Sequence, residues 1–230
     1  MVPAEPDRLQ APEASAAPEP LQPPLAVFVL APYRHGPTLV PMAGKTKVAL
    51  VAGGVRGLGL AVARGLAADG ATVHVTWRGS EQRAAELEAE FPGRVHRSDL
   101  LDRAAVGELV ERVVATDGSL ARVVSAVGDY HAGTLAETGP ERLDALWRSN
   151  VVTAMNLVDA TRPHLRAGGG SILLFGCAGL AGLRARRECA AYAAAKSALL
   201  VLLRSLAVEE APFGVTANMI SPGLVPHDAA

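Results

Sequence analysis

Residues 47–59 read KVALVAGGVRGLG, an apolar run that leads into a glycine-rich turn. The apolar run predicts a short strand, and the helical spacing of apolar residues beyond the turn predicts a helix. Glycine adopts the positive φ angles of such a turn at little cost. The missing side chains also let a pyrophosphate approach the backbone at the positive end of the helix. The stretch therefore predicts a nucleotide-binding turn, although a glycine trio by itself is as often a plain turn.

Downstream of this turn, apolar strands alternate with helices. Continuous apolar strands separated by helices indicate a parallel sheet that is covered on both faces. The sequence therefore predicts one α/β domain, a Rossmann-like doubly wound parallel sheet with ligands at the carboxyl ends of its strands. A long helix is expected from Pro140 to about Leu165, because proline is tolerated in a first helical turn. The expected strands are Lys47–Ala52, Thr72–Trp77, Arg94–Asp99, Ala121–Val127, Ser171–Phe175 and Val215–Ile220.

The composition of the 230-residue chain, 50% hydrophobic and 20% charged, is typical of a soluble globular protein. A formal net charge of −1 offers no basic field for nucleic acid. Two cysteines, Cys177 and Cys189, are too few for a disulfide framework or a zinc site, so no metal is expected. Free thiols fit a reducing cytoplasm. We also expect no membrane span, because no apolar stretch looks long enough.

The chain divides into two parts near Met42. Most of the 16 prolines precede that residue, so residues 1–41 are expected to be a disordered Pro/Ala-rich extension. This extension is either inert, upstream sequence translated from a misplaced start, or a tail with a binding role. Residues 42–230 form the expected dinucleotide-binding domain.

A tyrosine and a lysine stand one turn apart in the alanine-rich segment CAAYAAAKSALLVLL, residues 189–203. Tyr192 and Lys196 are spaced i,i+4, so they share one face of the predicted helix, with about 5–6 Å between their Cβ atoms. Taken alone, the pair is more often a surface contact that contributes a few tenths of a kcal/mol. Together with the glycine turn, it points to an acid–base pair beside a nucleotide.

These motifs, in this order, resemble the short-chain dehydrogenase/reductase family, over roughly residues 45–225. The glycine spacing is similar to that family's T-G-x-x-x-G-x-G, and Tyr192-x-x-x-Lys196 is similar to its catalytic pair. Asn150 matches the catalytic asparagine of the fourth helix. Within the family, the acyl-carrier-protein reductases and pteridine-reductase-like members look nearest. The positions that the resemblance assigns to the cofactor are Gly53, Gly57, Leu58, Gly59, Asp99, Leu100, Gly128, Tyr192, Lys196, Pro222 and Gly223. Arg56 and Arg78 are further candidates because of their charge.

The resemblance implies the chemistry of the site. Tyr192 exchanges a proton with a carbonyl or alcohol oxygen, Lys196 also holds the nicotinamide ribose, and Asn150 helps to hold a water in a proton relay. A lysine cation within about 4–6 Å favours the phenolate, so we expect Lys196 to lower the pKa of Tyr192. Hydride passes to or from the nicotinamide, while the protein positions and polarises the substrate. The family also implies a homo-oligomer.

The cofactor is expected to be NADP(H). An NAD enzyme usually carries an acidic residue after the second strand, to bind the ribose 2′-hydroxyl. Here the strand ends VTWRGS, with no acidic residue before Glu81, and Arg78 lies in the loop. Arg56, in the glycine turn, is a second cation, and guanidinium groups suit a phosphate dianion. The alternative is that both arginines are solvated surface residues.

The sequence departs from the family pattern at three places. After the fourth strand, the family's N-N-A-G is replaced by SAVG, residues 125–128. Cys177 stands where the family has a catalytic serine, either as a weak donor to the substrate oxygen or as a small apolar filler. The chain also stops at Ala230, apparently truncated after the sixth strand, which is expected to leave that strand as a bare edge.

The sequence therefore predicts an NADP(H)-dependent oxidoreductase that transfers hydride between nicotinamide and a carbonyl or secondary alcohol, for example a 3-oxoacyl thioester. Asn150, Cys177, Tyr192 and Lys196 are its candidate catalytic residues. The alternative is a non-catalytic nucleotide-binding protein of the same fold, or an inactive fragment. A third reading places another chemistry, such as dehalogenation or epimerisation, on the same scaffold. The sequence does not name the substrate.

Overall fold

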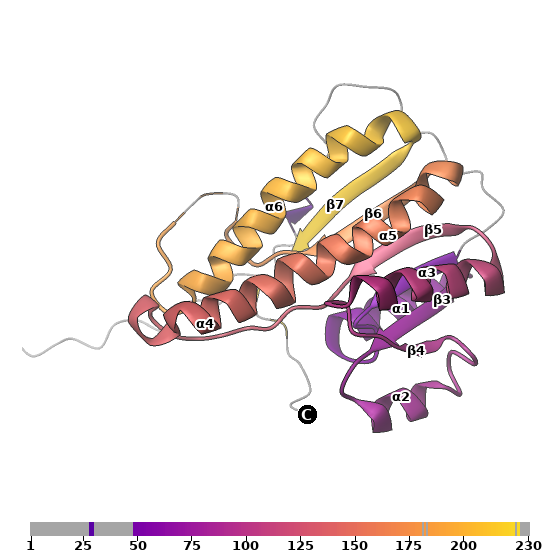
Figure 1. The fold of residues 1–230 in the computed structure, drawn as a ribbon, viewed down its shortest axis with the longest axis horizontal. Coiled ribbons are helices and arrows are strands. Elements are labelled where there is room, and N and C mark those ends of the chain that lie inside the picture. Colours follow the sequence, from indigo (N-terminus) through magenta and orange to yellow (C-terminus); the bar gives the residue numbers. More distant parts are fainter. Residues whose placement is uncertain (1–27, 30–47, 181, 183, 224, 226–230) are drawn as a thin grey trace, which may run out of the picture.

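Seven strands form one sheet in the computed structural model, which describes residues 28–29, 48–180, 182, 184–223 and 225 (Figure 1). The strand order is β1-β7-β6-β5-β2-β3-β4, and all neighbours are parallel except β1 and β7. The six parallel strands confirm the predicted doubly wound α/β sheet. The strands are β1 Phe28–Val29, β2 Val48–Ala52, β3 Thr72–Trp77, β4 Val95–Arg97, β5 Leu120–Ser125, β6 Gly170–Phe175 and β7 Val215–Ser221.

Helices cover both faces of the sheet. Helices α3, α5 and α6 share one core cluster with one face of the sheet, and α1 and α2 share a second cluster with the other. Side chains alternate along each strand, so Leu50 enters the first cluster and Val51 the second. The helices are α1 Gly57–Ala68, α2 Glu81–Leu87, α3 Arg103–Asp117, α4 Leu135–Trp147, α5 Thr153–Gly168 and α6 Ala190–Glu210.

The carboxyl ends of the central strands lie together at one edge of the sheet. Ala52 of β2 is in register with Ser125 of β5, and Ser125 with Leu174 of β6. Phe175, the last residue of β6, is in register with Ile220 of β7. The loops that leave these strands therefore converge on one region, where the sequence places the candidate site.

The single long helix expected from Pro140 to Leu165 is wrong in two respects. Helix α4 already begins at Leu135, after a capping box in which Thr134 and Glu137 bond each other's backbone. Gly139, with φ 60° and ψ 166°, kinks α4 directly before Pro140, so the proline does occupy a first helical turn. The second difference is a π-helical turn, Arg148–Val152, between α4 and α5.

The outer edge of β7 is paired. Phe28 and Val29 of β1 lie antiparallel to Ser221 and Ile220, so the expectation of a bare edge is wrong at these two residues. The rest of the predicted extension, residues 1–27 and 30–41, lies outside the described residues, as do residues 226–230. The expected disorder of that extension stays a prediction.

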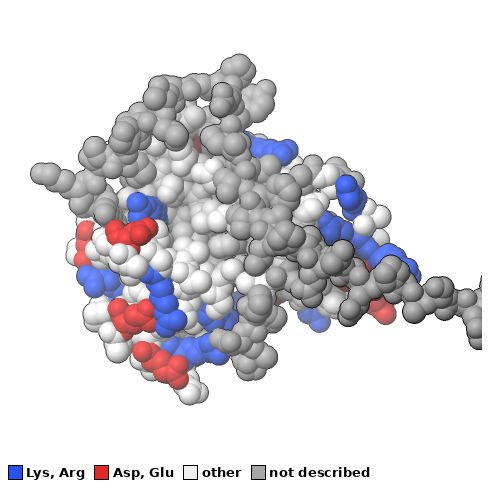
Figure 2. Space-filling view, turned by 180° about the vertical axis from the view of Figure 1, so that it is seen from behind, with Lys and Arg blue, Asp and Glu red and all other residues white. Residues whose placement is uncertain are grey.

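One segment, Ala190–Phe213, is long and apolar enough to cross a membrane by length and composition, contrary to the expectation from sequence. It comprises α6 and the following 3-10 turn. In the fold, α6 packs against β7 and α4, and Leu199, Leu203 and Leu206 are buried in the core. Charges of both signs lie interspersed over the described residues at the left of the back face (Figure 2), consistent with a net charge of −1.

Candidate active site

The glycine turn between β2 and α1 depends on its missing side chains. Gly53 has φ 75° and Gly57 has φ 52°, both in the region that favours glycine. A Cβ on Gly59 would clash with the carbonyl oxygen of Gly53, so the start of the helix lies directly against the turn. The backbone N–H of Gly53 donates to Oγ1 of Thr76, at 3.2 Å, and ties the turn to β3. The turn has the shape that a pyrophosphate cradle requires.

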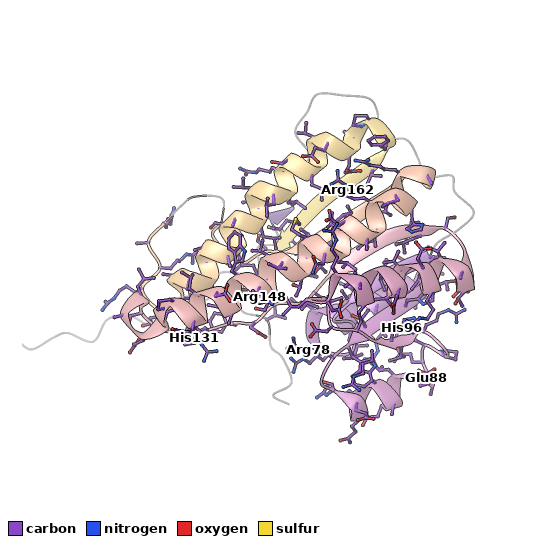
Figure 3. All side chains as sticks on the ribbon, viewed as in Figure 1. Arg78, Glu88, His96, His131, Arg148 and Arg162 are labelled. Carbon is purple, nitrogen blue, oxygen red and sulfur yellow. The ribbon has the colours of Figure 1, made fainter. Side chains whose placement is uncertain are left out.

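The two arginines expected at the cofactor lie at separate places. Arg56 is the exposed N-cap residue of α1, and Leu58, half-buried, follows in the first turn. Arg78 follows β3, and its side chain is 63% exposed; Figure 3 shows it toward the side where the strands end. Its Nη1 lies 3.8 Å from Oδ1 of Asp99, so the two expected cofactor residues form a long ion pair with each other. Leu100, beside Asp99, is buried.

Asn150 lies in the π-helical turn and is completely buried. Its Nδ2 donates to the carbonyl oxygens of Leu146 and Asp129, both at 2.9 Å. Within the described residues, its Oδ1 has no hydrogen-bond partner. That oxygen lies against Gly128, where a Cβ would clash with it and would also come within 3.4 Å of Lys196 Nζ. The structure therefore brings Gly128, Asn150 and Lys196 together, as the resemblance implies.

Lys196 is buried, and its Nζ donates to the carbonyl oxygen of Phe175 at 2.8 Å. Its Nζ lies 5.7 Å from the ring centroid of half-buried Tyr192, on the same face of α6. Burial lowers the pKa of Lys196 from its ordinary 10.5 to about 8, and the nearby Cys177 partly opposes this change. Half of the Lys196 side chains are therefore deprotonated near pH 8.

The expectation that Lys196 lowers the pKa of Tyr192 is wrong for this structure. Burial raises the pKa of Tyr192 to about 12, and the neighbouring Cys177, Cys189 and Tyr130 add to the effect. The lysine directs its ammonium at the carbonyl of Phe175 instead of at the phenol. Tyr192 is thus held as a neutral phenol, the form that donates a proton.

Cys177 is a free, half-buried thiol that packs against the core. Burial raises its pKa, and the positive charges of Arg186 and Lys196 partly oppose that change. It lies near enough to Tyr192 to affect that residue's pKa. A neutral thiol near the phenol suits either reading, the weak donor or the apolar filler.

The segment after β7 lies beside the end of β6. The backbone N–H of Gly176 donates to the carbonyl oxygen of Ile220 at 2.9 Å, and a Cβ on Gly176 would meet Oγ of Ser221. Pro222 and Gly223 follow directly, half-buried and exposed respectively. The structure therefore places these two residues at the same edge of the sheet as Cys177.

Two residues near the site went unnoticed in the sequence. Tyr130 is 65% exposed and packs edge-on against Tyr192, with ring centroids 5.0 Å apart. Arg186 bonds the backbone beside Cys177. Both lie in loops that follow strand ends, which is the only signal that the sequence offered for them.

A family model described as "Enoyl-(Acyl carrier protein) reductase" matches residues 52–230, the larger part of the chain. The chain belongs to the short-chain dehydrogenase/reductase family. No likeness to one branch, such as the 3-oxoacyl carrier-protein or pteridine reductases, is established.

Several relatives of this short-chain dehydrogenase/reductase are known. It is 34% identical to the cyclic-di-GMP-binding biofilm dispersal mediator protein of Escherichia coli, over 80% of this chain and 75% of that one. It is 32% identical to the D-beta-hydroxybutyrate dehydrogenase of Cupriavidus necator, over 78% and 70%. A short-chain dehydrogenase from Burkholderia cenocepacia in complex with NADP superposes with a TM-score of 0.72 at 36% identity, covering 78% of this chain and 75% of that one.

The residues present fit a bound dinucleotide. Gly53 and Gly59 pack against each other without side chains, so that backbone alone covers the positive end of α1. Further along the edge, Asn150 Oδ1 lies directly against Gly128, near the buried ammonium of Lys196, and has no hydrogen-bond partner among the described residues. As a member of its family, the protein is an oxidoreductase that acts on alcohol or carbonyl groups with NAD(P).

Proposed function

We propose that this protein is an NADP(H)-dependent oxidoreductase that interconverts a carbonyl and a secondary alcohol. The observation that carries the proposal is the meeting of Asn150 and Lys196 at Gly128, with Tyr192 one helical turn from Lys196. A bare nucleotide-binding fold does not require three such polar side chains, two of them buried, at one glycine. Their arrangement matches an acid–base site beside the cofactor's ribose.

The residues of the chain have distinct roles in this proposal. When bound, the nicotinamide supplies or accepts the hydride. The glycine turn and Pro222–Gly223 hold the cofactor's two ends, and Lys196 binds its ribose. Tyr192, whose phenol stays protonated, donates its proton to the carbonyl oxygen of the substrate. Asn150, whose Oδ1 has no hydrogen-bond partner among the described residues, helps to hold a water of the proton relay to Tyr192.

NADP(H) is favoured over NAD(H) by the charge around the adenosine ribose. Arg78 is largely exposed, and its contact with Asp99 is long, at 3.8 Å. Surface ion pairs of this kind contribute at most about 1 kcal/mol, so the guanidinium remains available to a 2′-phosphate. Exposed Arg56 adds a second positive charge at the glycine turn.

The competing function is a nucleotide-binding protein without turnover. Cys177 favours it, because the thiol packs against the core and burial keeps it neutral. The intact Tyr192 and Lys196 favour catalysis. The 3-oxoacyl thioester remains one candidate substrate among others.

The function is tested in two stages. NADPH and NADH are titrated by fluorescence, and we expect NADPH to bind at least tenfold more tightly, which is about 1.4 kcal/mol. Arg78→Asp should weaken NADPH and spare NADH, whereas the exposed Arg204→Gln on α6 should change neither. Equal affinities for the two cofactors would remove the case for NADP(H).

Turnover is then measured over small ketones, 3-oxoacyl thioesters and pterins. Tyr192→Phe should abolish turnover and leave NADPH binding nearly intact, because only one hydroxyl is lost. An active Tyr192→Phe variant would overturn the catalytic assignment. Cofactor binding with no turnover in any variant would favour the non-catalytic alternative.

We also propose a cytoplasmic homo-oligomer. Both cysteines are free thiols, which suits a reducing compartment. Val201, Leu202 and Val208 are exposed apolar residues of α6, and a second copy of the chain would cover them. Size-exclusion chromatography with light scattering measures the oligomeric state, and a monomer would contradict this proposal.

A further inference from the structure

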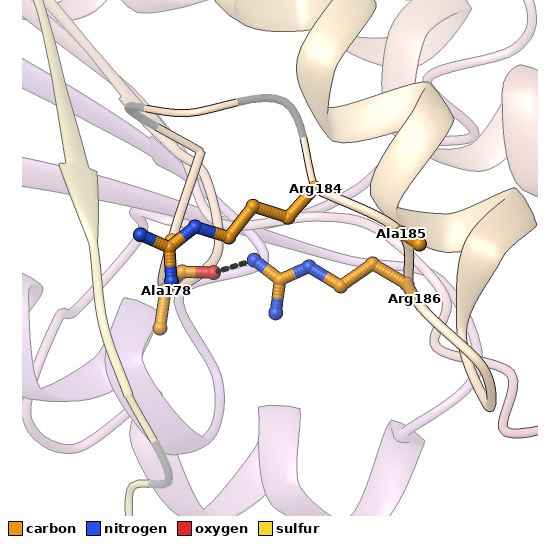
Figure 4. Close-up of a pocket in the computed structure, with 5 residues that line it drawn as sticks. Ala178, Arg184, Ala185 and Arg186 are labelled. Carbon is orange, nitrogen blue, oxygen red and sulfur yellow. Dashed lines mark hydrogen bonds between the residues drawn. The ribbon is translucent and has the colours of Figure 1, made fainter.

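A cavity of about 240 Å³ lies where the chain leaves β6, next to the candidate active site. Its lining residues are Ala178, Gly179, Arg184, Ala185 and Arg186. Figure 4 shows both arginine side chains reaching from the loop before α6 toward Ala178. Two guanidinium groups therefore line a small cavity that begins one residue after Cys177.

Arg186 is held in position by the backbone. Its Nη2 donates to the carbonyl oxygen of Ala178 at 2.6 Å. Gly179, with φ 77°, lies directly under the guanidinium, and a Cβ at that position would clash with it. One of five N–H donors is thus used, and four remain for a ligand. The half-buried Arg186 is a fixed donor group and not a freely moving surface side chain.

The charge of Arg186 reaches the reacting groups but is not neutralised nearby. Of the positive charges that act on the Cys177 thiol, it has the largest effect, and it acts against the burial that raises the pKa of this group. Within the described part of the chain, neither Arg184 nor Arg186 forms an ion pair with a carboxylate. Unpaired guanidinium groups at the wall of a cavity suit an anionic ligand.

We propose that Arg186, assisted by Arg184, binds a carboxylate of the substrate, so that the enzyme acts on small oxo acids and their hydroxy acids. This inference rests on the proposed oxidoreductase function. A guanidinium binds a carboxylate through two parallel N–H···O bonds, which fixes both position and orientation. The volume of about 240 Å³ lies below the 300–1,000 Å³ typical of drug-sized ligands and is enough for a carboxylate group and a few carbon atoms, so short acids are tested first.

The first test measures binding without turnover. Short carboxylates, from acetate to pentanoate, and the matching neutral amides are titrated in NMR experiments at saturating NADPH. The wild-type protein should bind the best acid at least tenfold more tightly than its amide. Arg186→Gln should reduce that ratio to near one, and Arg186→Lys, which keeps the charge without the planar fork, should keep part of it. Arg187→Gln, an exposed arginine of the same loop outside the cavity, should leave it unchanged.

The second test measures turnover. 2-, 3- and 4-Oxo acids are compared with their methyl esters, and a phosphorylated ketone tests whether the anion is a phosphate. The acid should exceed its ester at least tenfold in kcat/KM, and Arg186→Gln should bring the two close together. The inference is overturned if amides or esters match acids in the wild-type protein, if the phosphorylated ketone is preferred, or if Arg186→Gln keeps the preference for acids.

The two tests separate this inference from the function on which it rests. Turnover of neutral ketones alone would leave the oxidoreductase standing and remove the carboxylate site. Binding of acids at Arg186 without any turnover would keep the anion site and remove the proposed function.

Discussion

Replacing Lys196 by methionine should stabilise the free protein while it destroys the function. Lys196 is 4% exposed, and its ammonium donates a hydrogen bond to the Phe175 carbonyl. Methionine has a similar length and no charge, so it fills the same space without the desolvation cost of an ion. Natural proteins carry such costs where activity requires the group.

The magnitude follows from the pKa of the lysine. Burial lowers this pKa from 10.5 to about 8. A pKa lowered this far corresponds to about 3 kcal/mol of lost folding free energy at neutral pH. The lost hydrogen bond to Phe175 returns about 1 kcal/mol of that, which leaves a net gain of about 2 kcal/mol. For a chain of this size, we expect the Tm to rise by about 4–8 °C.

The pH dependence has a definite sign. The folded pKa lies below the unfolded one, so between pH 8 and 10.5 the unfolded chain holds a proton that the folded chain has lost. The stability of the wild-type protein therefore rises with pH across this window. The methionine variant lacks this rise, so its advantage is full below pH 8 and shrinks toward pH 10.5. The raised pKa of Tyr192 lowers stability only above pH 10, and it does so in both proteins.

Thermal denaturation at pH 7, 8, 9 and 10 tests this reasoning, with Arg142→Met at an exposed position of α4 as the control. The control should keep the wild-type pH profile. The reasoning would be refuted by a Lys196→Met variant that melts at or below the wild-type temperature at pH 7. It would also be refuted if the difference in Tm between variant and wild type were as large at pH 10 as at pH 7. Fluorescence titration should show that the same variant binds NADPH poorly.

Three further predictions concern the surroundings of the site and the edge of the sheet. Cys177→Ser should raise kcat and Cys177→Ala should lower it, because donors to a developing oxyanion contribute about 2.7–4 kcal/mol and a thiol supplies only part of this; equal steady-state rates would mark a filler. Gly128→Ala should cost about 1–3 kcal/mol in denaturant unfolding and most of the turnover, because φ 152° and the clash with Asn150 disfavour any Cβ; a fully active variant would contradict this. His96, whose pKa burial lowers to about 4, bonds the fully buried His74 at 2.8 Å, so stability should fall as pH drops from 6.5 to 4. His96→Gln should flatten that pH profile, and an unchanged profile would remove the histidine pair as its cause.

The fold was largely predictable because its signals are local and repeated. The central strands β2 and β5 are apolar runs buried on both faces, and the observed bounds of the six parallel strands differ from the expected ones by at most two residues. The pairing of β1 with β7 was not predictable, since two residues in a proline-rich segment give no strand pattern. The register of non-local pairs depends on the whole sheet and not on the segment itself.

The proximity of the main candidate residues was predictable from the sequence, whereas their electrostatics were not. Tyr192 and Lys196 follow from helical spacing, and both do lie on one face of α6. The direction of the Tyr192 pKa was wrong, because burial outweighs a cation that points elsewhere. Sequence spacing predicts which residues share a helix face, whereas their desolvation depends on the loops and helices that pack over them. Arg186 was missed for a similar reason, because its position depends on a hydrogen bond to the carbonyl of Ala178, eight residues earlier in the same loop.

The π-helical turn that contains Asn150 is a backbone feature of this site, whereas Cys177 is a side-chain departure from the family pattern. Asn150 reaches Gly128 because a π-helical turn widens the helix: the carbonyl of Leu146 accepts Asn150 Nδ2 at 2.9 Å and Ser149 Oγ at 3.4 Å. Such a turn is costly in an ordinary helix and occurs often at functional sites. A chain that had lost its activity would gain by relaxing it, yet the turn persists, with the buried oxygen of Asn150 unpartnered among the described residues. Cys177, which the family resemblance aligns with a serine, would change one donor, whereas the close approach of Asn150 to Gly128 remains, and that approach favours a working enzyme over a degenerate nucleotide-binding fold.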